Sequence, residues 1–366
     1  MPTKLRVPLK TQTASPYVAG KPIDELAREL GLDPATIVKL ASNENPLGMS
    51  PKAIAAVAAL DPATVSRYPD ANGFALKRVI AKHHDVAPDS IVLGNGSENL
   101  LELVAKALVE PGVSAVSSQY GFIAFAQSIH NLGGENIIVP AKDLANDLEA
   151  MLAAIRPDTV VLYVANPNNP TGTFVEPSAM EAFLARVPAN VLVVLDEAYN
   201  EYLPPELRFD GTRYPSRFSN VIVTRTFSKV YGLAGLRVGY SVSSLEVADY
   251  LNRVRTVFNV NEHAQTAAAA ALQDTEFVER SYAHNRSELI RVQRALTELG
   301  LAFVDSVANF VLVNVGDANA VNQKLLIRGV IVRPMGMYGL NEWLRVSIGT
   351  ASENDRMLAT LAEVLA

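Results

Sequence analysis

The chain contains no cysteine among its 366 residues. This absence excludes a disulfide framework, a thiolate metal site and a cysteine nucleophile. Lysine and arginine number 32 against 38 acidic residues, and the formal net charge is -6. A nucleic-acid or anionic-membrane partner would require a clustered basic patch, which this balance gives no reason to expect. We therefore expect a small-molecule ligand.

Long apolar runs are also missing. No run approaches the ~20 residues needed to span a bilayer, and residues 1–10 lack the apolar core of ~7 to 15 residues found in signal peptides. We therefore expect a cytoplasmic protein with no membrane segment. The chain is still 49% hydrophobic. Single cores stop growing at about 250–300 residues, so its length predicts a large domain and a smaller lobe.

The middle of the chain alternates short β-rich runs with amphipathic helical patterns. Predicted strands at 91–93, 159–165, 191–195 and 221–224 each lead into a polar or glycine-containing loop. This order predicts an α/β fold with a mainly parallel sheet covered by helices on both faces. Ligands bind beyond the carboxyl ends of the strands in such sheets, so the four loops should converge on one crevice.

The flanking segments predict the smaller lobe. Ser50 and Pro51 are typical of the N-cap and first residue of a helix, and strand-like runs occur at 310–314 and 330–333 before a final helix from Glu353. We expect residues 1–60 to form an N-terminal arm and part of the small domain, residues 61–260 the large domain, and residues 261–366 the C-terminal small domain.

Lys229 is the best candidate for covalent chemistry. It follows a predicted strand and the hydroxyl residues Thr226 and Ser228, and it precedes a glycine-rich stretch that contains Arg237. A lysine forms a Schiff base only if it is held near a carbonyl carbon and can lose its proton. The hydroxyls and the planar guanidinium fork can bind phosphate. A lone loop lysine is usually only solvated, so these neighbours support the hypothesis.

Three polar residues follow the other predicted strands. Asp196 comes directly after the run VLVVL, where burial of a carboxylate is costly without a cation such as a protonated pyridine nitrogen. An aspartate here can also simply cap the next turn. Tyr199 can hold its phenol near the same ring. Asn169 lies in the stiff run NPNNPTG, which can aim its amide at a ring oxygen.

The loop after the predicted strand at 91–93 is a candidate anion site. Gly96, Ser97 and Glu98 lie between a strand and a helix, so backbone N–H groups and the helix dipole attract an anion. The loop is not the dinucleotide fingerprint, because Asn99 occupies the third glycine position. Tyr120 can supply an aromatic face for a heterocycle, and a core tyrosine is an equal alternative.

Two arginines near the C-terminus are candidate clamps for a substrate anion. Arg333 and Arg345 flank the glycine-containing segment 335–339. A guanidinium can bind a carboxylate or phosphate through two parallel hydrogen bonds. The alternative for both residues is a surface salt bridge, which contributes little.

Seven motifs occur in an order that resembles a known family. They are SNENPLG, RYPD, GNGSE, NPNNPTG, DEAY, TFSK with AGLRVGY, and LRVSIGT. The set is similar to that of fold-type I pyridoxal 5'-phosphate (PLP) aminotransferases, and specifically to histidinol-phosphate aminotransferases, from about Ser15 to the C-terminus. The resemblance implies a large PLP-binding domain with a mainly parallel seven-stranded sheet, a small domain from both termini, and a homodimer with active sites at the interface.

The resemblance implies a role for each residue around the PLP ring. Lys229 would be the Schiff-base lysine and the base for proton transfer, and Asp196 would pair with the pyridinium nitrogen. Tyr199 and Asn169 would bind the ring O3', and Tyr120 would stack on the ring.

Two further groups of residues follow from the same resemblance. The phosphate would be bound by Gly96, Ser97, Glu98, Ser228 and Arg237, joined by Tyr68 from the other subunit. The residues near the substrate would be Arg345, Arg333, Tyr17 and Asn45. Two positions depart from the family pattern: Val230 stands where a small residue is common, and Asn341 where proline is common.

The implied reaction is transamination between L-histidinol phosphate and 2-oxoglutarate, with glutamate as product, in histidine biosynthesis. An aminotransferase for aromatic amino acids or prephenate-type precursors is a close alternative on the same fold, and a phosphothreonine-type decarboxylase a more distant one. A PLP-sensing regulator would need an effector domain, for which no helix-turn-helix or basic segment remains. Asn99 disfavours a nicotinamide dehydrogenase.

Overall fold

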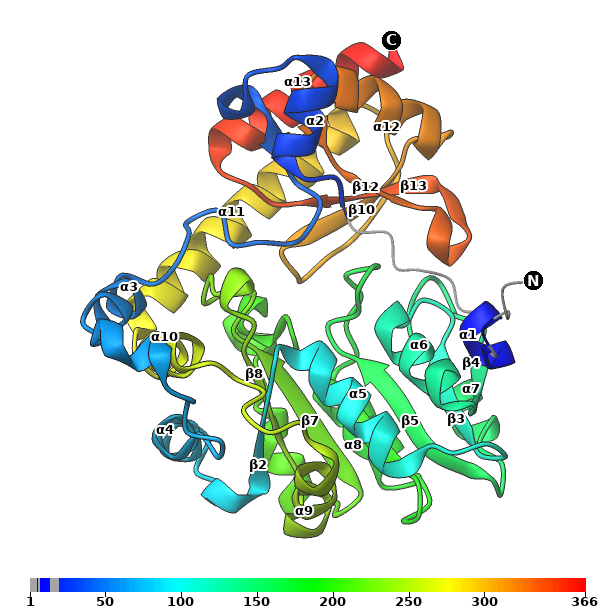
Figure 1. Ribbon diagram of the computed structural model, residues 1–366. Coiled ribbons are helices and arrows are strands. Elements are labelled where there is room, and N and C mark those ends of the chain that lie inside the picture. The colour runs from blue at the N-terminus through cyan, green and yellow to red at the C-terminus, as the bar shows by residue number, and fades with distance from the viewer. Residues whose placement is uncertain (1–4, 6, 14–19) are drawn as a thin grey trace.

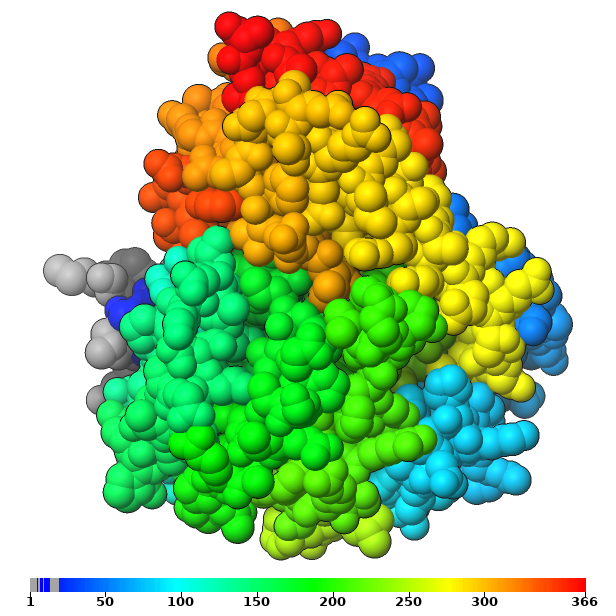
Figure 2. Space-filling model, turned by 180° about the vertical axis from the view of Figure 1, so that it is seen from behind, coloured from blue at the N-terminus to red at the C-terminus, as the bar shows by residue number. Residues whose placement is uncertain are grey.

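The computed structural model describes residue 5, residues 7–13 and residues 20–366. Tyr17, predicted to lie near the substrate, is outside these residues. The chain forms two lobes, and the long helix α11 (Thr275–Glu298) runs from the lower lobe into the upper one (Figure 1). Seen from behind, the C-terminal segments cap the molecule above the lobe built by the middle of the chain (Figure 2).

The lower lobe is built on a seven-stranded sheet with the order β2-β8-β7-β6-β5-β3-β4. Neighbouring strands are parallel except at β8, which is antiparallel to both β2 and β7. The strands are β2 (Ile91–Gly94), β3 (Ser114–Ser118), β4 (Glu135–Val139), β5 (Thr159–Ala165), β6 (Leu192–Asp196), β7 (Val221–Thr226) and β8 (Gly239–Val242). The predicted α/β fold with a mainly parallel sheet is confirmed.

Four of these strands were predictable because they are apolar runs buried on both faces. β2, β5, β6 and β7 coincide with the predicted strands to within two residues at each end. The sequence pattern did not identify β3, β4 or β8. β3 reads SAVSS, and small polar residues weaken the β signal although the strand is fully buried. β4 lies at the sheet edge, where most of its residues are partly exposed.

Helices cover both faces of this sheet, and strand residues alternate between them. Leu192 and Val194 pack with α5 (Ser97–Leu108), α6 (Ile123–Leu132) and α9 (Leu245–Val254). Val193 and Leu195 pack with α7 (Leu148–Ala153) and α8 (Pro177–Leu184) on the opposite face. The alternation places Asp196 on the α5 face, one residue after the last buried aliphatic side chain of β6.

Three helices pack beside the β2 and β8 edge of the sheet. They are α3 (Pro51–Ala58), α4 (Phe74–His84) and α10 (Glu262–Leu272). Ser50 caps α3 by accepting a hydrogen bond from the Ala53 N–H at 3.4 Å, and Pro51 is the first residue of the helix, as predicted. The domain boundaries at 60/61 and 260/261 stay predictions.

The upper lobe joins segments from both ends of the chain. Its four-stranded antiparallel sheet has the order β12-β13-β10-β9, formed by β9 (Phe303–Val304), β10 (Phe310–Asn314), β12 (Arg333–Met335) and β13 (Leu340–Ser347). β1 (Val38–Lys39) pairs in parallel with β11 (Val330–Ile331). Val38 and Leu40 therefore share one core with residues of β10, β13 and the last helix.

The lobe is covered by α2 (Ile23–Leu30), α12 (Ala318–Ile327) and α13 (Ala351–Leu365). α13 begins two residues before the predicted start at Glu353, because Thr350 is its N-cap and Glu353 completes a capping box. The short helix α1 (Leu9–Thr13) lies beside α6 (Figure 1). Within the described part of the chain, no helix combines the length and apolar character needed to cross a membrane.

Candidate active site

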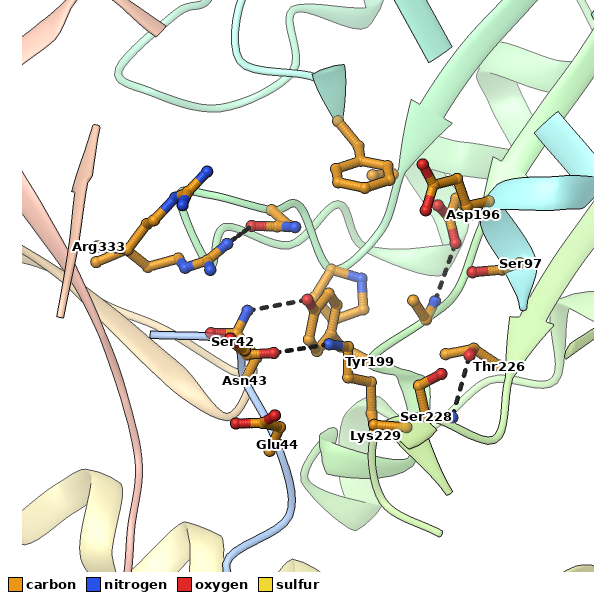
Figure 3. Close-up of a pocket in the computed structure, with 18 of the residues that line it drawn as sticks. Ser42, Asn43, Glu44, Ser97, Asp196, Tyr199, Thr226, Ser228, Lys229 and Arg333 are labelled. Carbon is orange, nitrogen blue, oxygen red and sulfur yellow. Dashed lines mark hydrogen bonds between the residues drawn. The ribbon is translucent and has the colours of Figure 1, made fainter. Parts of the chain in front are cut away.

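A pocket of about 280 Å³ lies between the carboxyl ends of the large-sheet strands and the upper lobe. The chain at or just beyond the carboxyl ends of β2, β5, β6 and β7 supplies part of its lining, through Ser97, Asn169, Asp196 and Lys229 respectively. The upper lobe supplies Arg333, Arg345 and the segment 41–44. The four loops predicted to converge therefore meet at one site, drawn in Figure 3.

Lys229 is partly buried and lines this pocket. Its Nζ donates a hydrogen bond to the Ser42 carbonyl at 3.0 Å and lies 5.7 Å from the ring centre of Tyr199 (Figure 3). Burial lowers the pKa of Lys229 to about 8, and the charge of Arg345 acts in the same direction. At pH 7 roughly a tenth of this amine is then uncharged, far more than for an ordinary lysine, and the uncharged form is the nucleophile and proton acceptor.

Asp196 ends β6 and is only 5% exposed. Its Oδ2 accepts a hydrogen bond from the Tyr163 hydroxyl at 2.9 Å, and its Oδ1 accepts one from the Ala198 N–H at 3.2 Å. The second bond caps the turn after β6, which was the alternative role for Asp196 in the sequence analysis. The same carboxylate therefore caps this turn and lines the pocket. Burial raises the pKa of Asp196 above its usual range. A cation in the pocket would stabilise the charged form.

Tyr199 contributes a phenol that is held from two sides. Its hydroxyl accepts a hydrogen bond from the Asn43 amide at 3.0 Å, and its ring packs edge-on against Phe310 with centres 5.2 Å apart. Burial raises the pKa of Tyr199 to about 12. The phenol is therefore protonated at neutral pH and can donate a hydrogen bond into the pocket.

Asn169 and the two arginines connect the lobes. Arg345 donates to Asn169 Oδ1 at 2.6 Å and to the Ala41 carbonyl at 2.8 Å. Arg333 lies directly opposite Arg345 in the β12–β13 ladder, so both side chains are on the same face of the small sheet. Figure 3 shows Arg333 across the pocket from Asp196 and Ser97. The pocket thus has cationic side chains at the end remote from Asp196.

The predicted anion site lies at the other end. α5 begins at Ser97 without a side-chain cap, and Ser97 and Glu98 line the pocket. Arg237 donates a hydrogen bond to Ser228 Oγ at 3.4 Å. Gly96 has a φ of +81°, and a Cβ added there would lie 2.5 Å from Nη2 of Arg237. Only glycine allows this close approach, which leaves the arginine and the helix N-terminus facing one space.

Four of the described site residues do not line this pocket within one chain: Gly96, Tyr120, Asn45 and Tyr68. The Tyr120 ring packs against the cluster of Leu312, Met335 and Leu340, and the pocket lining contains Phe122 instead. The Asn45 amide donates to the Val230 carbonyl at 2.7 Å and to Ser281 Oγ at 2.9 Å. Tyr68 is 82% exposed. The stacking role of Tyr120 and the substrate role of Asn45 stay predictions that these positions do not support.

Several lining residues were not among the predicted site residues. They include Gly20, Ser42, Asn43, Glu44, Phe122 and Tyr163. Ser42 and Asn43 belong to the SNENPLG motif, so the motif was the available signal, although Asn45 was chosen from it. Tyr163 lies inside the buried strand β5. The only sequence signal for it was the alternation of side chains along this strand, which puts Tyr163 on the same face of the sheet as Asp196. Among the described residues, no cluster of three or more histidine or acidic side chains could hold a metal ion.

The fold and site define an enzyme of the two-lobed α/β type, with a partly buried lysine and a buried carboxylate in one pocket. The family model for class I and II aminotransferases matches residues 35–361. The chain belongs to this family.

Comparison with individual relatives and solved structures shows which members of the family the chain is similar to. The chain is 54% identical to histidinol-phosphate aminotransferase 1 of Cupriavidus pinatubonensis, covering 96% of this chain and 94% of that protein. It is 52% identical to histidinol-phosphate aminotransferase of Methylobacillus flagellatus, with 98% and 97% covered. The crystal structure of the Sinorhizobium meliloti histidinol-phosphate aminotransferase in complex with pyridoxal-5'-phosphate is 31% identical, with a TM-score of 0.91, and the match covers 100% of this chain and 98% of that one.

Proposed function

We propose that the protein is a PLP-dependent aminotransferase that transfers the amino group of L-histidinol phosphate to 2-oxoglutarate. The donor carbon becomes a carbonyl, and 2-oxoglutarate becomes glutamate. The observation that carries the proposal is the arrangement of one pocket, in which Lys229, Asp196 and an anion site at the start of α5 face one another. Relatives that cover nearly the whole chain bear the name histidinol-phosphate aminotransferase, which supports the choice of donor.

The residues present in the pocket fit PLP. The space beside Gly96, which a Cβ would fill, leaves Arg237 and the N–H groups of α5 available to a phosphate. Asp196 offers a buried carboxylate to a protonated ring nitrogen, and Tyr199 and Asn169 line the same pocket. PLP, when bound, supplies the electron sink for the reacting carbon.

The chain's own residues supply proton transfer and orientation. Lys229 has a pKa of about 8, so it can accept a proton from the donor carbon and return it, as general acid–base catalysis requires. Arg345 is held by Asn169 and the Ala41 carbonyl, which fixes the guanidinium for an incoming anion. Residues of both lobes line the pocket around these groups.

A direct test uses colour. The purified protein reconstituted with PLP should be yellow, lose this colour with glutamate, and regain it with 2-oxoglutarate. Colour that glutamate does not change would mean cofactor binding without turnover. Absence of colour would rule out PLP. A cytoplasmic location remains part of the proposal, and cell fractionation tests it.

Replacing the two arginines of the upper lobe should distinguish between the possible amino donors. Histidinol phosphate carries a phosphate and no carboxylate, whereas glutamate and aromatic amino acids carry a carboxylate. Arg345 can bind either anion through its guanidinium, so Arg345→Ala should impair both half-reactions. Arg333 adds positive charge for the phosphate, so Arg333→Ala should impair the reaction of histidinol phosphate more than that of phenylalanine. Loss of one charge-assisted contact, worth about 1.5–3 kcal/mol, lowers kcat/KM about ten- to a hundred-fold. Stopped-flow rates of each half-reaction measure the effect.

Arg328→Ala is the matched control, because Arg328 is an exposed arginine of the same lobe outside the pocket. It should leave both half-reactions unchanged. Aromatic donors are the alternative substrates, favoured by Phe122 in the pocket wall. Equal losses for histidinol phosphate and phenylalanine in Arg333→Ala would favour this alternative.

A homodimer is also part of the proposal, with Tyr68 reaching the PLP phosphate of the neighbouring subunit. Tyr68 stacks on Phe258 with ring centres 4.5 Å apart, and both rings lie outside the pocket of their own chain. Val65 and Val257 are also exposed, at 70% and 64%. Exposed apolar side chains of this kind are typical of an interface.

Subunit exchange tests the role of Tyr68. Lys229→Ala subunits mixed with an equal amount of Tyr68→Ala subunits should recover activity, because each heterodimer contains one site with both residues intact. After random exchange, about a quarter of all active sites contain both residues intact. The recovered activity should therefore approach about a quarter of the wild-type activity. Each variant alone is the control. No recovery after verified exchange would show that Tyr68 acts within its own subunit or not at all.

A further inference from the structure

Tyr163 lies directly behind Asp196. The two residues are on neighbouring strands, β5 and β6, and the register of these strands puts Tyr163 beside Val194, two residues before Asp196 on the same face. The Tyr163 hydroxyl donates to Asp196 Oδ2 at 2.9 Å. The ring is 1% exposed and stacks on Phe125 with centres 4.7 Å apart and 15° between the planes. The hydroxyl is therefore held in place by packing on a helix of the large lobe.

Few other groups near Asp196 stabilise the negative charge of its carboxylate. The Ala198 N–H donates to Oδ1 at 3.2 Å, Thr224 lies directly opposite on β7, and Lys229 and Tyr199 face the same pocket. Burial raises the pKa of Asp196, and the Tyr163 hydrogen bond is the largest opposing influence. Burial also holds the pKa of Tyr163 well above its usual value, so the phenol remains a donor.

We propose that Tyr163 is a positioning residue for the cofactor, whose hydroxyl holds the Asp196 carboxylate charged and directed at the ring nitrogen of PLP. The inference rests on the proposed aminotransferase function and assigns a residue that acts through Asp196. A purely structural role would need only the ring, because phenylalanine fills the same space against Phe125. The hydroxyl adds a charge-assisted hydrogen bond to the carboxylate that must receive the pyridinium.

The test measures the dissociation constant of PLP from acid to mildly alkaline pH in the wild type and in Tyr163→Phe. Loss of the hydroxyl raises the pKa of Asp196, so the variant carries a neutral Asp196 up to a higher pH than the wild type. A neutral Asp196 cannot pair with a protonated ring. The variant should therefore bind PLP about ten- to a hundred-fold more weakly at acid pH, and the ratio of the two constants should shrink as pH rises.

Tyr214→Phe is the matched control. Tyr214 is 2% exposed, and its hydroxyl donates to the Pro177 carbonyl at 3.5 Å in the core on the opposite face of the large sheet. This variant should bind PLP like the wild type at every pH. The absorbance of bound PLP gives a second readout, because its pH profile should move in Tyr163→Phe and stay in place in Tyr214→Phe.

Two results would overturn the role of Tyr163. Equal PLP affinity in Tyr163→Phe and wild type would show that the hydroxyl does nothing for the cofactor. A loss of affinity that is the same at every pH would reduce Tyr163 to a packing residue. In both cases PLP binding by the wild type would leave the proposed function standing, whereas failure of the wild type to bind PLP would refute the function and the inference together.

Discussion

Replacing Lys229 with alanine should abolish transamination while leaving the fold and non-covalent PLP binding in place. The loss of the proton-transfer group alone should slow the reaction by about 10²- to 10⁴-fold, and the loss of the covalent attachment point adds to this. Arg237, the N-terminus of α5 and Asp196 would still hold the cofactor. Single-turnover rates with glutamate measure the loss, and a PLP titration monitors binding.

The assignment has an independent chemical check. Borohydride reduction of the PLP-loaded wild type followed by peptide mapping should place the pyridoxyl label on Lys229. Lys106→Ala, at an exposed position of α5, is the control and should retain full activity and the same label. A label on a different lysine would refute the role of Lys229.

Asp196→Asn should bind PLP yet turn over at least about a hundred-fold more slowly, because the ring nitrogen would lose the carboxylate that keeps it protonated and the electron sink would weaken. The amide is nearly isosteric with the carboxylate, so packing around β6 should persist. The kcat of each half-reaction and the thermal unfolding midpoint should be measured together.

Asp274→Asn provides a matched comparison. Asp274 is also 5% exposed and accepts a hydrogen bond from Ser50 Oγ at 2.6 Å, but it lies outside the pocket. Its replacement should lower the free energy of unfolding and leave kcat unchanged. If Asp196→Asn kept a rate within a few-fold of wild type, Asp196 would not be the pyridinium partner.

Local sequence patterns predicted the strands whose ends carry the site. β2, β5, β6 and β7 are short apolar runs followed by polar or glycine-rich loops, and each of these signals lies within a few neighbouring residues. Lys229, Asp196 and the loop at Gly96 could therefore be predicted as one site, since a parallel sheet brings the carboxyl ends of its strands to one edge. The order of the seven motifs also predicted membership of the aminotransferase family, and the match to the family model confirmed this prediction.

Which side chains of a predicted loop enter the pocket could not be predicted in the same way. Asn43 and Asn45 stand in one motif, but Asn43 donates to Tyr199 whereas Asn45 donates to Val230 and Ser281. Tyr120 and Phe122 stand in one loop, and only Phe122 lines the pocket. Loop backbones lack a fixed repeat, so the direction of each side chain depends on the packing around it.

Local periodicity and residue chemistry were sufficient to specify the class of fold, the strand ends that carry polar groups and a candidate Schiff-base lysine. The contacts of Arg345 with Asn169 and of Tyr163 with Asp196, in contrast, exist only in the folded chain. Both contacts join residues far apart in the sequence. They depend on the docking of the two lobes and on the register of β5 against β6, and both are set by the packing of the whole core.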